Sequence, residues 1–408
     1  MPIITIFSGS FCELDSVVKE VINDTGFRQI TDDEIVIEAS RRSAMAESKI
    51  KRAFSTKTSV FNKYTMEKER SIAFIKLAVA ELAAEGKALM TGFSGMLIPD
   101  TVEHVLRVSL VASKEYRIEA ATKQKGVSKK EAGRLVKKGD EQCAGWVRYV
   151  CGNKDPWDPA LYDIVIPVDK MSVTEAAALI AENAGKDILQ PDTESKLALE
   201  DFRLAAEVEA ALAREGHTVD VSARKGAVTL TINRHVLRLN RLQEELKSIA
   251  QPISGVQAVE TKTGKDFHKS NIYRKHDFEM PSKVLLVDDE REFVHTLSER
   301  LIMRDMGSAV AYNGESALKL IKEDEPEVII VDLKMPGVDG IEVLRKVKET
   351  RPEIEVIIVT GHGHEEDRQL CMDLGAFAYL QKPLDINALS ETIQKANEKV
   401  QQKIGKEG

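Results

Sequence analysis

Five polar side chains in the last third of the chain stand where hydrophobic runs end. The run VLLVDDE contains Asp288 and Asp289, VIIVDLKMPG contains Asp332, VIIVTGHG contains Thr360, and FAYLQKP carries Lys382. Short β-branched and aliphatic runs of this kind predict buried strands of a parallel sheet. The carboxyl ends of such strands border one crevice, so residues far apart in the sequence converge there. We therefore expect these five side chains to form one site.

The acidic members of this group suit a hard divalent cation. Asp288, Asp289 and Asp332, with the backbone carbonyl of Lys334, supply the oxygen ligands that Mg²⁺ prefers. A carboxylate beside such an ion can attack phosphorus, while a fixed ammonium offsets charge on the transferring oxygens. Asp332 and Lys382 fit these two roles. The sequence thus predicts Mg²⁺-dependent phosphoryl transfer to Asp332.

Two further residues suggest how a phosphorylated state would be passed on. Thr360 can hydrogen-bond a phosphoryl group on Asp332 and move toward it. This movement would leave room for Tyr379 to rotate inward and repack one face of the domain. We expect Thr360 and Tyr379 to form a switch.

The motifs DD, D-x-K-M-P-G, T-G and K-P, in this order on alternating strands and helices, resemble the two-component receiver family over residues 281–403. The resemblance implies a flavodoxin-like (βα)5 fold with the parallel strand order 2-1-3-4-5. It also implies a sensor histidine kinase or phosphotransfer protein as donor, and a receiver that catalyses its own phosphorylation and dephosphorylation. Lys334 and His362, two positions after Asp332 and Thr360, would flank the phosphate and set its lifetime.

The rest of the chain divides into three segments that differ in their pattern of predicted helices and strands. In residues 1–185 short β-branched runs (IITIF, VLRVSLVA, YDIVIPV) alternate with long helical patterns, and this alternation of strands and helices is typical of a layered α/β domain. Residues 195–264 contain a helical pattern, two strand-like runs around a glycine turn, a second helical pattern and a last strand-like run. Residues 265–280 are polar without a sustained period and predict an exposed linker. The fold class is therefore α/β and multidomain.

The opening stretch IITIFSGSF followed by a helical run predicts a strand, a tight turn and a helix, the geometry that offers backbone N–H groups to a phosphate. Gly9 and Ser10 in this turn are the candidate nucleotide-binding residues. A P-loop requires G-x-x-x-x-G-K-[ST], and this turn has no lysine. Phe11 and Cys12 add bulk where glycines would let a phosphate approach.

The stretches VSKKEAGRLVKKGDE and DPWDPALYDIVIPVDKMSVTEAAALI resemble the cytidylate-kinase-like family, and the resemblance extends over residues 1–185. It implies a P-loop-kinase-like three-layer α/β domain. The departures from the family pattern fall where the chemistry would be, at Phe7 and Ser8, at Thr91, Gly92 and Phe93, and at Asp140, Glu141, Gln142 and Cys143.

At the position of Cys143 the family has an arginine. That arginine would stabilise charge on the transferring phosphoryl group and contribute on the order of 10³-fold or more to the rate. We predict a pseudo-kinase that keeps the fold. Arg117, Arg134 and Arg148 remain as cations. They either decorate exposed helices or bind an anion.

Residues 195–264 resemble a BON domain in the stretches GHTVDVSARKGAVTLTI and SGVQAVET. Such domains are associated with membrane or small-ligand attachment, often outside the cytoplasm. An intracellular linker, or a dimerisation module that would make the protein a homodimer, agrees better with the absence of a signal peptide. Membrane contact is not expected, because the apolar positions of RHVLRLNRLQEELKSIA have the spacing of a helix core. These positions are Val236, Leu239, Leu242 and Leu246.

Composition narrows the function classes. A net charge of -8 over 408 residues and the lack of a helix-turn-helix pattern disfavour nucleic acid as a partner. The four cysteines form no CxxC pair, and no run is long and apolar enough to span a bilayer, so the prediction is a cytoplasmic protein. We predict a response regulator that relays its phosphorylation state to a non-DNA-binding output. The open alternatives are a receiver-gated nucleotide kinase of cytidylate type and a membrane or protein adaptor acting through residues 195–264.

Overall fold

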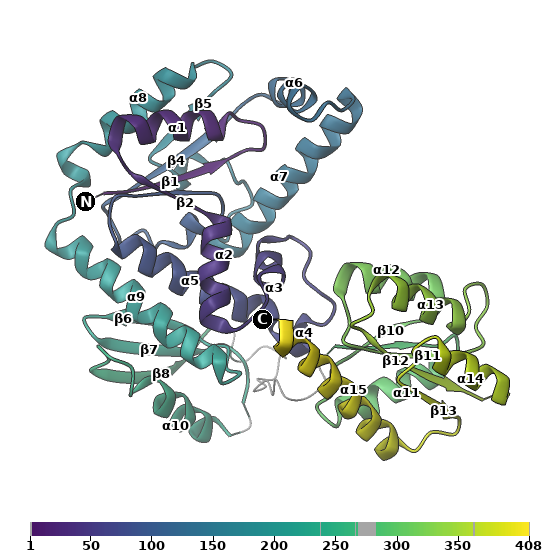
Figure 1. Cartoon of the computed structure of the whole chain (residues 1–408). Helices are drawn as coiled ribbons and strands as arrows, with labels where there is room; N and C mark the ends of the chain where they lie inside the picture. The colour runs from purple at the N-terminus through teal and green to yellow at the C-terminus, as the bar shows by residue number, and fades with distance from the viewer. Residues whose placement is uncertain (1, 237, 266, 268–282, 362–363, 408) are drawn as a thin grey trace. The chain divides into compact units, whose positions relative to one another are not determined.

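The computed structural model describes residues 2–236, 238–265, 267, 283–361 and 364–407. Most of the predicted linker and His362 lie outside the described residues. The chain forms two compact units, Met1–Thr58 with Glu67–Lys275 and Ser59–Met66 with His276–Gly408. Both contain strands and helices (Figure 1). No helix in the described part is long and apolar enough to cross a membrane.

The first unit contains a parallel five-stranded sheet with the strand order β2-β3-β1-β4-β5. Because β1 pairs with both β3 and β4, the turn after β1 leaves the middle of the sheet at its carboxyl edge. This sheet confirms the layered α/β architecture predicted for the N-terminal part. The strands are β1 (Ile3–Ser8), β2 (Arg28–Thr31), β3 (Ala88–Thr91), β4 (Val105–Val111) and β5 (Ile164–Pro167).

Helices cover both faces of this sheet. Alternate residues of β1 face opposite sides, as the period of a strand requires. Ile4 and Ile6 therefore share a core with α1 and α8, whereas Ile3 and Phe7 share one with α2, α5 and α7. The helices of this part are α1 (Leu14–Thr25), α2 (Asp32–Ser43), α3 (Glu47–Lys51), α5 (Glu67–Ala84), α6 (Lys114–Lys125), α7 (Lys129–Cys151) and α8 (Val173–Ala184), and α4 (Asn62–Thr65) lies in the segment grouped with the second unit.

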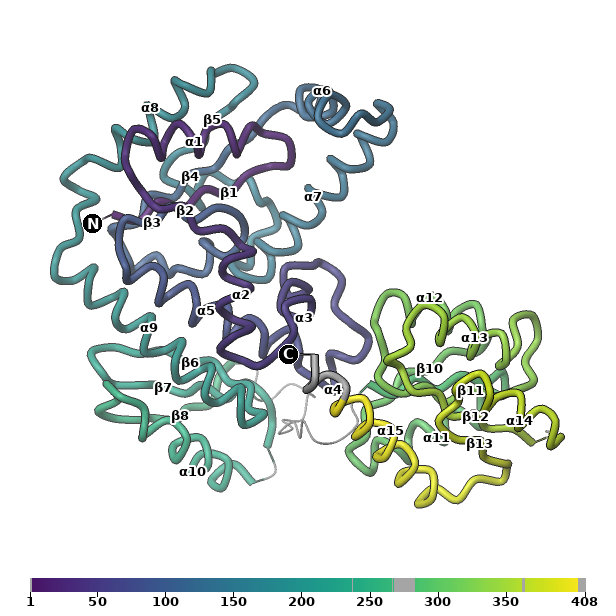
Figure 2. The backbone as a smooth tube through the Cα atoms, viewed as in Figure 1, coloured from purple at the N-terminus to yellow at the C-terminus, as the bar shows by residue number. Residues whose placement is uncertain are grey.

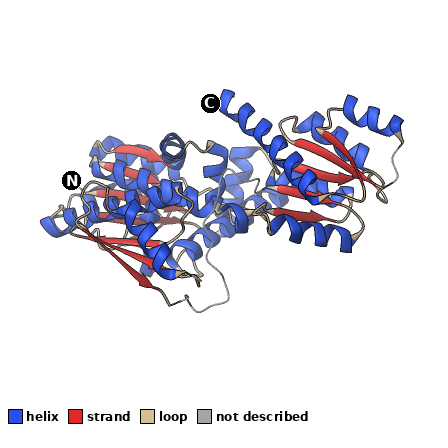
Figure 3. Ribbon diagram, turned by 90° about the horizontal axis from the view of Figure 1, so that it is seen from below, coloured by secondary structure: helices blue, strands red, loops and turns tan. Residues whose placement is uncertain are grey.

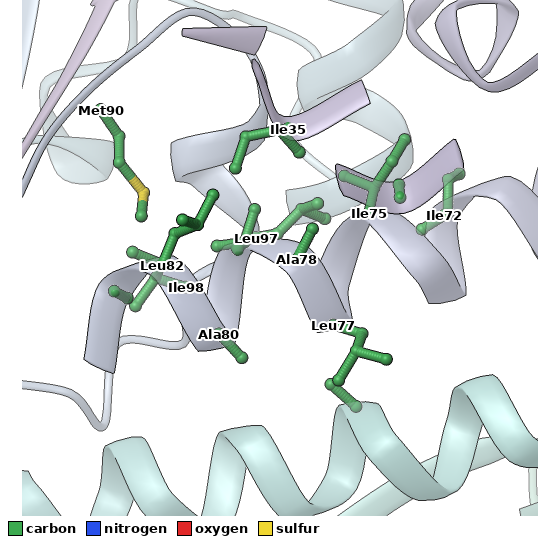
Figure 4. Close-up of a cluster of buried hydrophobic side chains, with 14 of the residues drawn as sticks. Ile35, Ile72, Ile75, Leu77, Ala78, Ala80, Leu82, Met90, Leu97 and Ile98 are labelled. Carbon is green, nitrogen blue, oxygen red and sulfur yellow. The ribbon is translucent and has the colours of Figure 1, made fainter. Parts of the chain in front are cut away.

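Helix α5 is apolar on nearly every side, which is typical of a helix buried on two faces. One face packs on the sheet and the other on α9 (Thr193–Arg214). Figure 4 shows Leu77 pointing toward the neighbouring helix and Ile75 pointing away from it. The long helix α9 is thereby anchored to the N-terminal domain through α5.

A three-stranded mixed sheet comes after α9 in the chain. Strands β6 (Asp220–Arg224) and β7 (Ala227–Ile232) form an antiparallel hairpin, and β8 (Ala258–Thr263) adds in parallel after α10 (Leu239–Ala250). The order helix, two strands, helix, strand is the predicted one. Figure 2 traces this path from α9 through β6, β7 and α10.

The second unit has a parallel sheet with the order β10-β9-β11-β12-β13, which confirms the predicted order 2-1-3-4-5. Helices lie on both faces of it (Figure 3). Helices α11 and α15 share a core with one face, and α12, α13 and Cys371 of α14 share a core with the other. The elements are β9 (Val284–Val287), α11 (Arg291–Ile302), β10 (Ser308–Ala311), α12 (Gly314–Asp324), β11 (Val328–Asp332), α13 (Gly340–Thr350), β12 (Glu355–Thr360), α14 (Glu365–Asp373), β13 (Ala378–Gln381) and α15 (Ile386–Glu407).

Candidate functional site

Lys382 is at the centre of the candidate site at the carboxyl edge of the second unit's sheet. Its Nζ lies 2.8 Å from Asp288 Oδ2 and 3.3 Å from Asp332 Oδ1. Asp288 directly follows β9, Asp332 ends β11, and Lys382 directly follows β13. The parallel topology therefore brings together three of the residues that the sequence singled out.

The two carboxylates sit in a largely buried setting. Asp288 is 3% exposed and Asp332 is 7% exposed. Burial raises the pKa of Asp332 above its ordinary value, Lys382 opposes this shift, and the neighbouring Asp288 adds to it. Although burial lowers the pKa of Lys382, its hydrogen bonds to Asp288 and Glu290 raise that pKa overall. The site holds more negative than positive charge, and this excess favours a bound cation.

Backbone groups hold both carboxylates in place. Asp288 Oδ1 accepts from the N–H of Glu290 at 2.8 Å, and Asp332 Oδ2 accepts from the N–H of Lys334 at 2.9 Å. Helix α13 begins close behind the second of these. A Cβ atom on Gly340 would lie 2.2 Å from the carbonyl oxygen of Asp332, so only glycine allows this approach.

Two further residues contact Lys382, and sequence reasoning missed both. Glu290 Oε1 lies 3.0 Å from Lys382 Nζ, and the centroid of the Phe293 ring lies 4.3 Å from the same atom. Glu290 is the residue after the DD pair, and its side chain is 69% exposed. The only sequence signal for Glu290 was that it follows Asp289 directly. An acidic residue that merely faces solvent in a loop could stand at the same place.

The remaining predicted residues lie around this centre. Asp289 is exposed and lines a surface hollow with Lys334 and Asp367. Thr360 is 1% exposed, and its carbonyl accepts from the N–H of Lys382 at 2.9 Å. The buried hydroxyl of Tyr379 has no hydrogen-bond partner among the described residues. Within this same set, no three acidic, histidine or cysteine side chains are clustered as a metal site.

The turn after β1 is the second candidate site, and it lines a cavity of about 420 Å³. The N–H of Gly9 donates to the carbonyl of Leu110 at 3.0 Å and is not available to a ligand. Helix α7 lies directly against the turn. A Cβ atom on Gly139 would lie 2.0 Å from Ser10 Oγ, so glycine in α7 is what permits this contact.

Arg117 lies beside the same turn, and the structure corrects the sequence-based interpretation that it decorates an exposed helix. It is 6% exposed rather than on a helix surface, and its charge is already matched. Its Nη1 and Nη2 atoms lie 2.7 Å and 2.6 Å from the two carboxylate oxygens of Asp140. The hydrogen bonds to Asp140 raise the pKa of Arg117, which therefore stays charged. Arg134 and Arg148 are exposed.

Aromatic rings fill the space between this turn and the end of β3. Phe7 and Phe93 lie with ring centroids 5.7 Å apart, and Phe93 stacks on Phe54 at 5.8 Å. Asp32 accepts from the N–H groups of Phe93 and Ser94 at 2.7 Å and 2.9 Å. Two backbone donors that could otherwise hold an anion are thus occupied by a carboxylate of the protein itself.

Comparison with known proteins identifies two regions. The chain matches the cytidylate kinase-like family at residues 3–170 and the response regulator receiver domain at residues 284–394. It is similar to sporulation initiation phosphotransferase F of Bacillus subtilis (strain 168), with 34% identity over 116 residues that cover 28% of this chain and 94% of the relative. It is also similar to the transcriptional regulatory protein CpxR of Escherichia coli (strain K12), with 39% identity over 113 residues that cover 28% of this chain and 48% of the relative.

The chain therefore spans about half the length of CpxR. Among solved structures, it is similar to a response regulator receiver domain protein from Clostridium thermocellum. The identity is 33%, the match covers 29% of this chain and 97% of that chain, and the TM-score is 0.29.

Proposed function

This chain belongs to the response regulators through its C-terminal receiver domain and carries a cytidylate kinase-like domain at its N-terminus, and on this premise we propose that Asp332 is its phosphoacceptor. A receiver domain implies a histidine kinase or a phosphotransfer protein as the partner. The observation that carries the proposal is the ammonium of Lys382, which is shared by Asp288 and Asp332 at the carboxyl edge of the sheet.

The proposed step is a displacement at phosphorus. A carboxylate oxygen of Asp332 attacks the phosphorus of a phosphohistidine, the P–N bond breaks, and the imidazole, which carries a proton on its other ring nitrogen, leaves as a neutral ring. Lys382 stands close enough to Asp332 to offset charge on the transferring oxygens. The burial that raises the pKa of Asp332 also removes water that would weaken this interaction.

The donor set fits Mg²⁺, which receiver domains generally use for phosphorylation. Asp288 and Asp332 converge, Asp289 lies at the end of the same strand as Asp288, and the carbonyl of Lys334 follows Asp332 by two positions. Carboxylate and carbonyl oxygens are what a hard cation takes, and their summed negative charge exceeds that of one ammonium. A bound Mg²⁺ would neutralise charge on the phosphoryl oxygens.

We propose Thr360 and Tyr379 as the switch that reads this state. Thr360 ends the strand next to Asp332, and the buried Tyr379 hydroxyl lacks a hydrogen-bond partner in the described part of the chain. A buried hydroxyl without a partner costs about 1–3 kcal/mol. This cost favours a second position of the ring in which the hydroxyl is paired, and we propose that movement of Thr360 toward a phosphoryl group lets the ring take it.

For the N-terminal domain we propose a fold kept without nucleotide kinase activity. Arg117 is neutralised by Asp140, the turn N–H of Gly9 bonds to Leu110, and aromatic rings stand where donors would be needed. Titration calorimetry with ATP·Mg²⁺ should give no low-micromolar binding. Steady CMP-dependent release of ADP would instead support the receiver-gated kinase.

The phosphoacceptor is tested by intact-mass spectrometry after treatment with acetyl phosphate, with and without Mg²⁺. The wild type should gain one phosphoryl group only when Mg²⁺ is present, and Asp332→Asn should gain none. Asp373→Asn removes an exposed carboxylate of α14 and should behave as the wild type. A labelled Asp332→Asn protein, or a wild type that stays unlabelled, would overturn the assignment.

A further inference from the structure

The hairpin of α6 and α7 carries a concentration of positive charge that the net charge of the chain conceals. Residues 123–138 contain seven lysines and arginines and one acidic residue, Glu131, whereas the whole chain has a net charge of -8. All seven cationic side chains are exposed. We call these seven the basic hairpin surface, and they are Lys123, Lys125, Lys129, Lys130, Arg134, Lys137 and Lys138.

The protein itself does little to neutralise this surface. Among the described residues, one ion pair involves it, between Lys137 Nζ and Glu141 Oε1 at 3.7 Å, and both side chains are mostly exposed. An exposed pair of this kind contributes little to stability. The charges are therefore not explained as internal salt bridges.

Helix electrostatics explain only part of the pattern. Lys123 and Lys125 stand in the last turn of α6, where cations interact favourably with the helix dipole. Lys129 and Lys130 stand in the first turn of α7 behind the Ser128 cap, where cations are unfavourable. Local structure would select against the second pair, so an external partner is the better explanation for it.

On α7 the cations form one stripe. Lys130, Arg134, Lys137 and Lys138 have the spacing i, i+4, i+7 and i+8, which places them on one helix face. Lys130 and Lys138 are about 12 Å apart along the axis at 1.5 Å per residue. Each strand of a duplex carries one phosphate per about 3.4 Å of the helix axis, so three or four phosphates of one strand can lie opposite this stripe.

The composition of the surface distinguishes between classes of partner. Lysine is depleted from protein interfaces, which depend on aromatic and apolar anchors. Insertion into a membrane surface also requires such anchors, and residues 123–138, which carry the seven cations, contain no Phe, Tyr or Trp. Tyr149 of α7 lies eleven positions beyond Lys138 and stacks on Trp146. The absence of aromatic residues among the cations also disfavours single strands, which bind by stacking bases on aromatic rings. Contacts made by lysine and arginine alone are typical of binding to a phosphate backbone.

We propose that the basic hairpin surface binds the phosphate backbone of duplex nucleic acid without reading its sequence. This binding does not depend on the phosphorylation of Asp332. It also revises the sequence-based expectation of no nucleic-acid partner, which depended on the net charge of the whole chain. The surface lies on the hairpin formed by α6 and α7, which Figure 2 shows at the periphery of the domain that contains β1–β5.

The test is fluorescence polarisation of labelled 20-base-pair DNA and RNA duplexes with the full chain. Three or four phosphate contacts predict a slope of log K against log salt of about −2.7 to −3.6. Affinity should therefore fall about 40- to 150-fold between 50 and 200 mM NaCl. The DNA and RNA arms distinguish the two sources of the same phosphate chemistry, and two unrelated DNA sequences should bind equally.

A matched pair of triple variants separates the surface from bulk charge. Lys130→Gln, Arg134→Gln and Lys138→Gln together should reduce the magnitude of the salt slope by about two to three. Lys19→Gln, Lys87→Gln and Lys170→Gln remove the same charge from exposed positions of the same domain and should leave the slope unchanged.

The proposal is overturned if no duplex binds at 50 mM NaCl, or if both triple variants lose affinity equally. Tighter binding to anionic vesicles or to polyglutamate than to either duplex would also overturn it and identify a membrane or an acidic protein as the partner. Circular dichroism should show that both variants remain folded, which the exposure of the six side chains supports.

Discussion

The ion pair between Arg117 and Asp140 offers a direct test of how the turn after β1 is closed. Asp140→Asn leaves the buried guanidinium of Arg117 without its countercharge. Removing one member of a buried pair costs about 3–5 kcal/mol. Asp140 is 36% exposed and asparagine retains one acceptor, so we expect a smaller loss of about 2–3 kcal/mol.

The loss should be local, because the pair joins α6 to α7. A cost of about 2–3 kcal/mol raises the equilibrium constant for local opening about 30- to 150-fold. Hydrogen exchange read by mass spectrometry on peptides of α6 and α7 measures this change in the full chain. Lys137→Gln is the control in the same helix, since its pair with Glu141 is exposed and should contribute no more than about 0.5 kcal/mol.

A second measurement asks where the freed charge acts. A Cβ atom on Gly9 would lie 2.9 Å from Arg117 Nη1, so the guanidinium already borders the turn. In Asp140→Asn it should acquire measurable affinity for pyrophosphate, whereas the wild type should show none. The reasoning fails if α7 exchanges no faster in Asp140→Asn than in Lys137→Gln, and equally if the wild type binds pyrophosphate as well as the variant does.

Three further outcomes are expected from the geometry. Glu290→Gln should raise the rate of phosphorylation by acetyl phosphate up to about five-fold, because the exposed ion pair between Glu290 and Lys382 stabilises the present position of the ammonium by about 0.2–1 kcal/mol. The control Glu292→Gln removes an exposed acid in the first turn of α11 and should leave the rate unchanged. Burial raises the pKa of Cys12 to about 11, so at pH 8 only about one thiol in a thousand is ionised; iodoacetamide should label the exposed Cys151 first and reach Cys12 as the pH rises toward 11. The full chain should not float with anionic liposomes at physiological salt, because the apolar positions of α10 and of the three-stranded sheet fill one core and those of α9 also pack on α5. Flotation would instead favour the membrane adaptor.

Convergence at the receiver site was predictable because it depends on topology. Parallel strands place their carboxyl ends together whatever the loops between them do. Asp288, Asp332 and Lys382 could therefore be assigned to one site from the order of their motifs. Glu290 and Phe293 could not, since their contacts with Lys382 depend on side-chain conformations at the start of α11 that no sequence period encodes.

The N-terminal site shows the opposite case. The sequence showed that the turn lacks lysine, but it did not show what occupies the space. Asp140 lies 23 positions from Arg117, and their pairing requires α6 to fold back on α7. The sequence assigned the stretch between the domains 1–185 and 195–264 to neither of them, yet it forms a 3-10 turn at Asp187–Leu189 and leads into α9. A tertiary contact explains this, because Ser195 Oγ accepts from the N–H of His104 at 3.0 Å.

The same physical rule separates the two strand-end sites of this chain. In the receiver, two buried carboxylates share the ammonium of Lys382, so negative charge remains that a cation can neutralise. Beside the turn of the N-terminal domain, Arg117 already has both carboxylate oxygens of Asp140. A site that is electrostatically complete gains little by binding a charged ligand, whereas an incomplete one gains the full interaction. Chemistry is therefore expected where charge is left unmatched, and restoring an unmatched cation beside Gly9 is the change that should return anion binding to the turn.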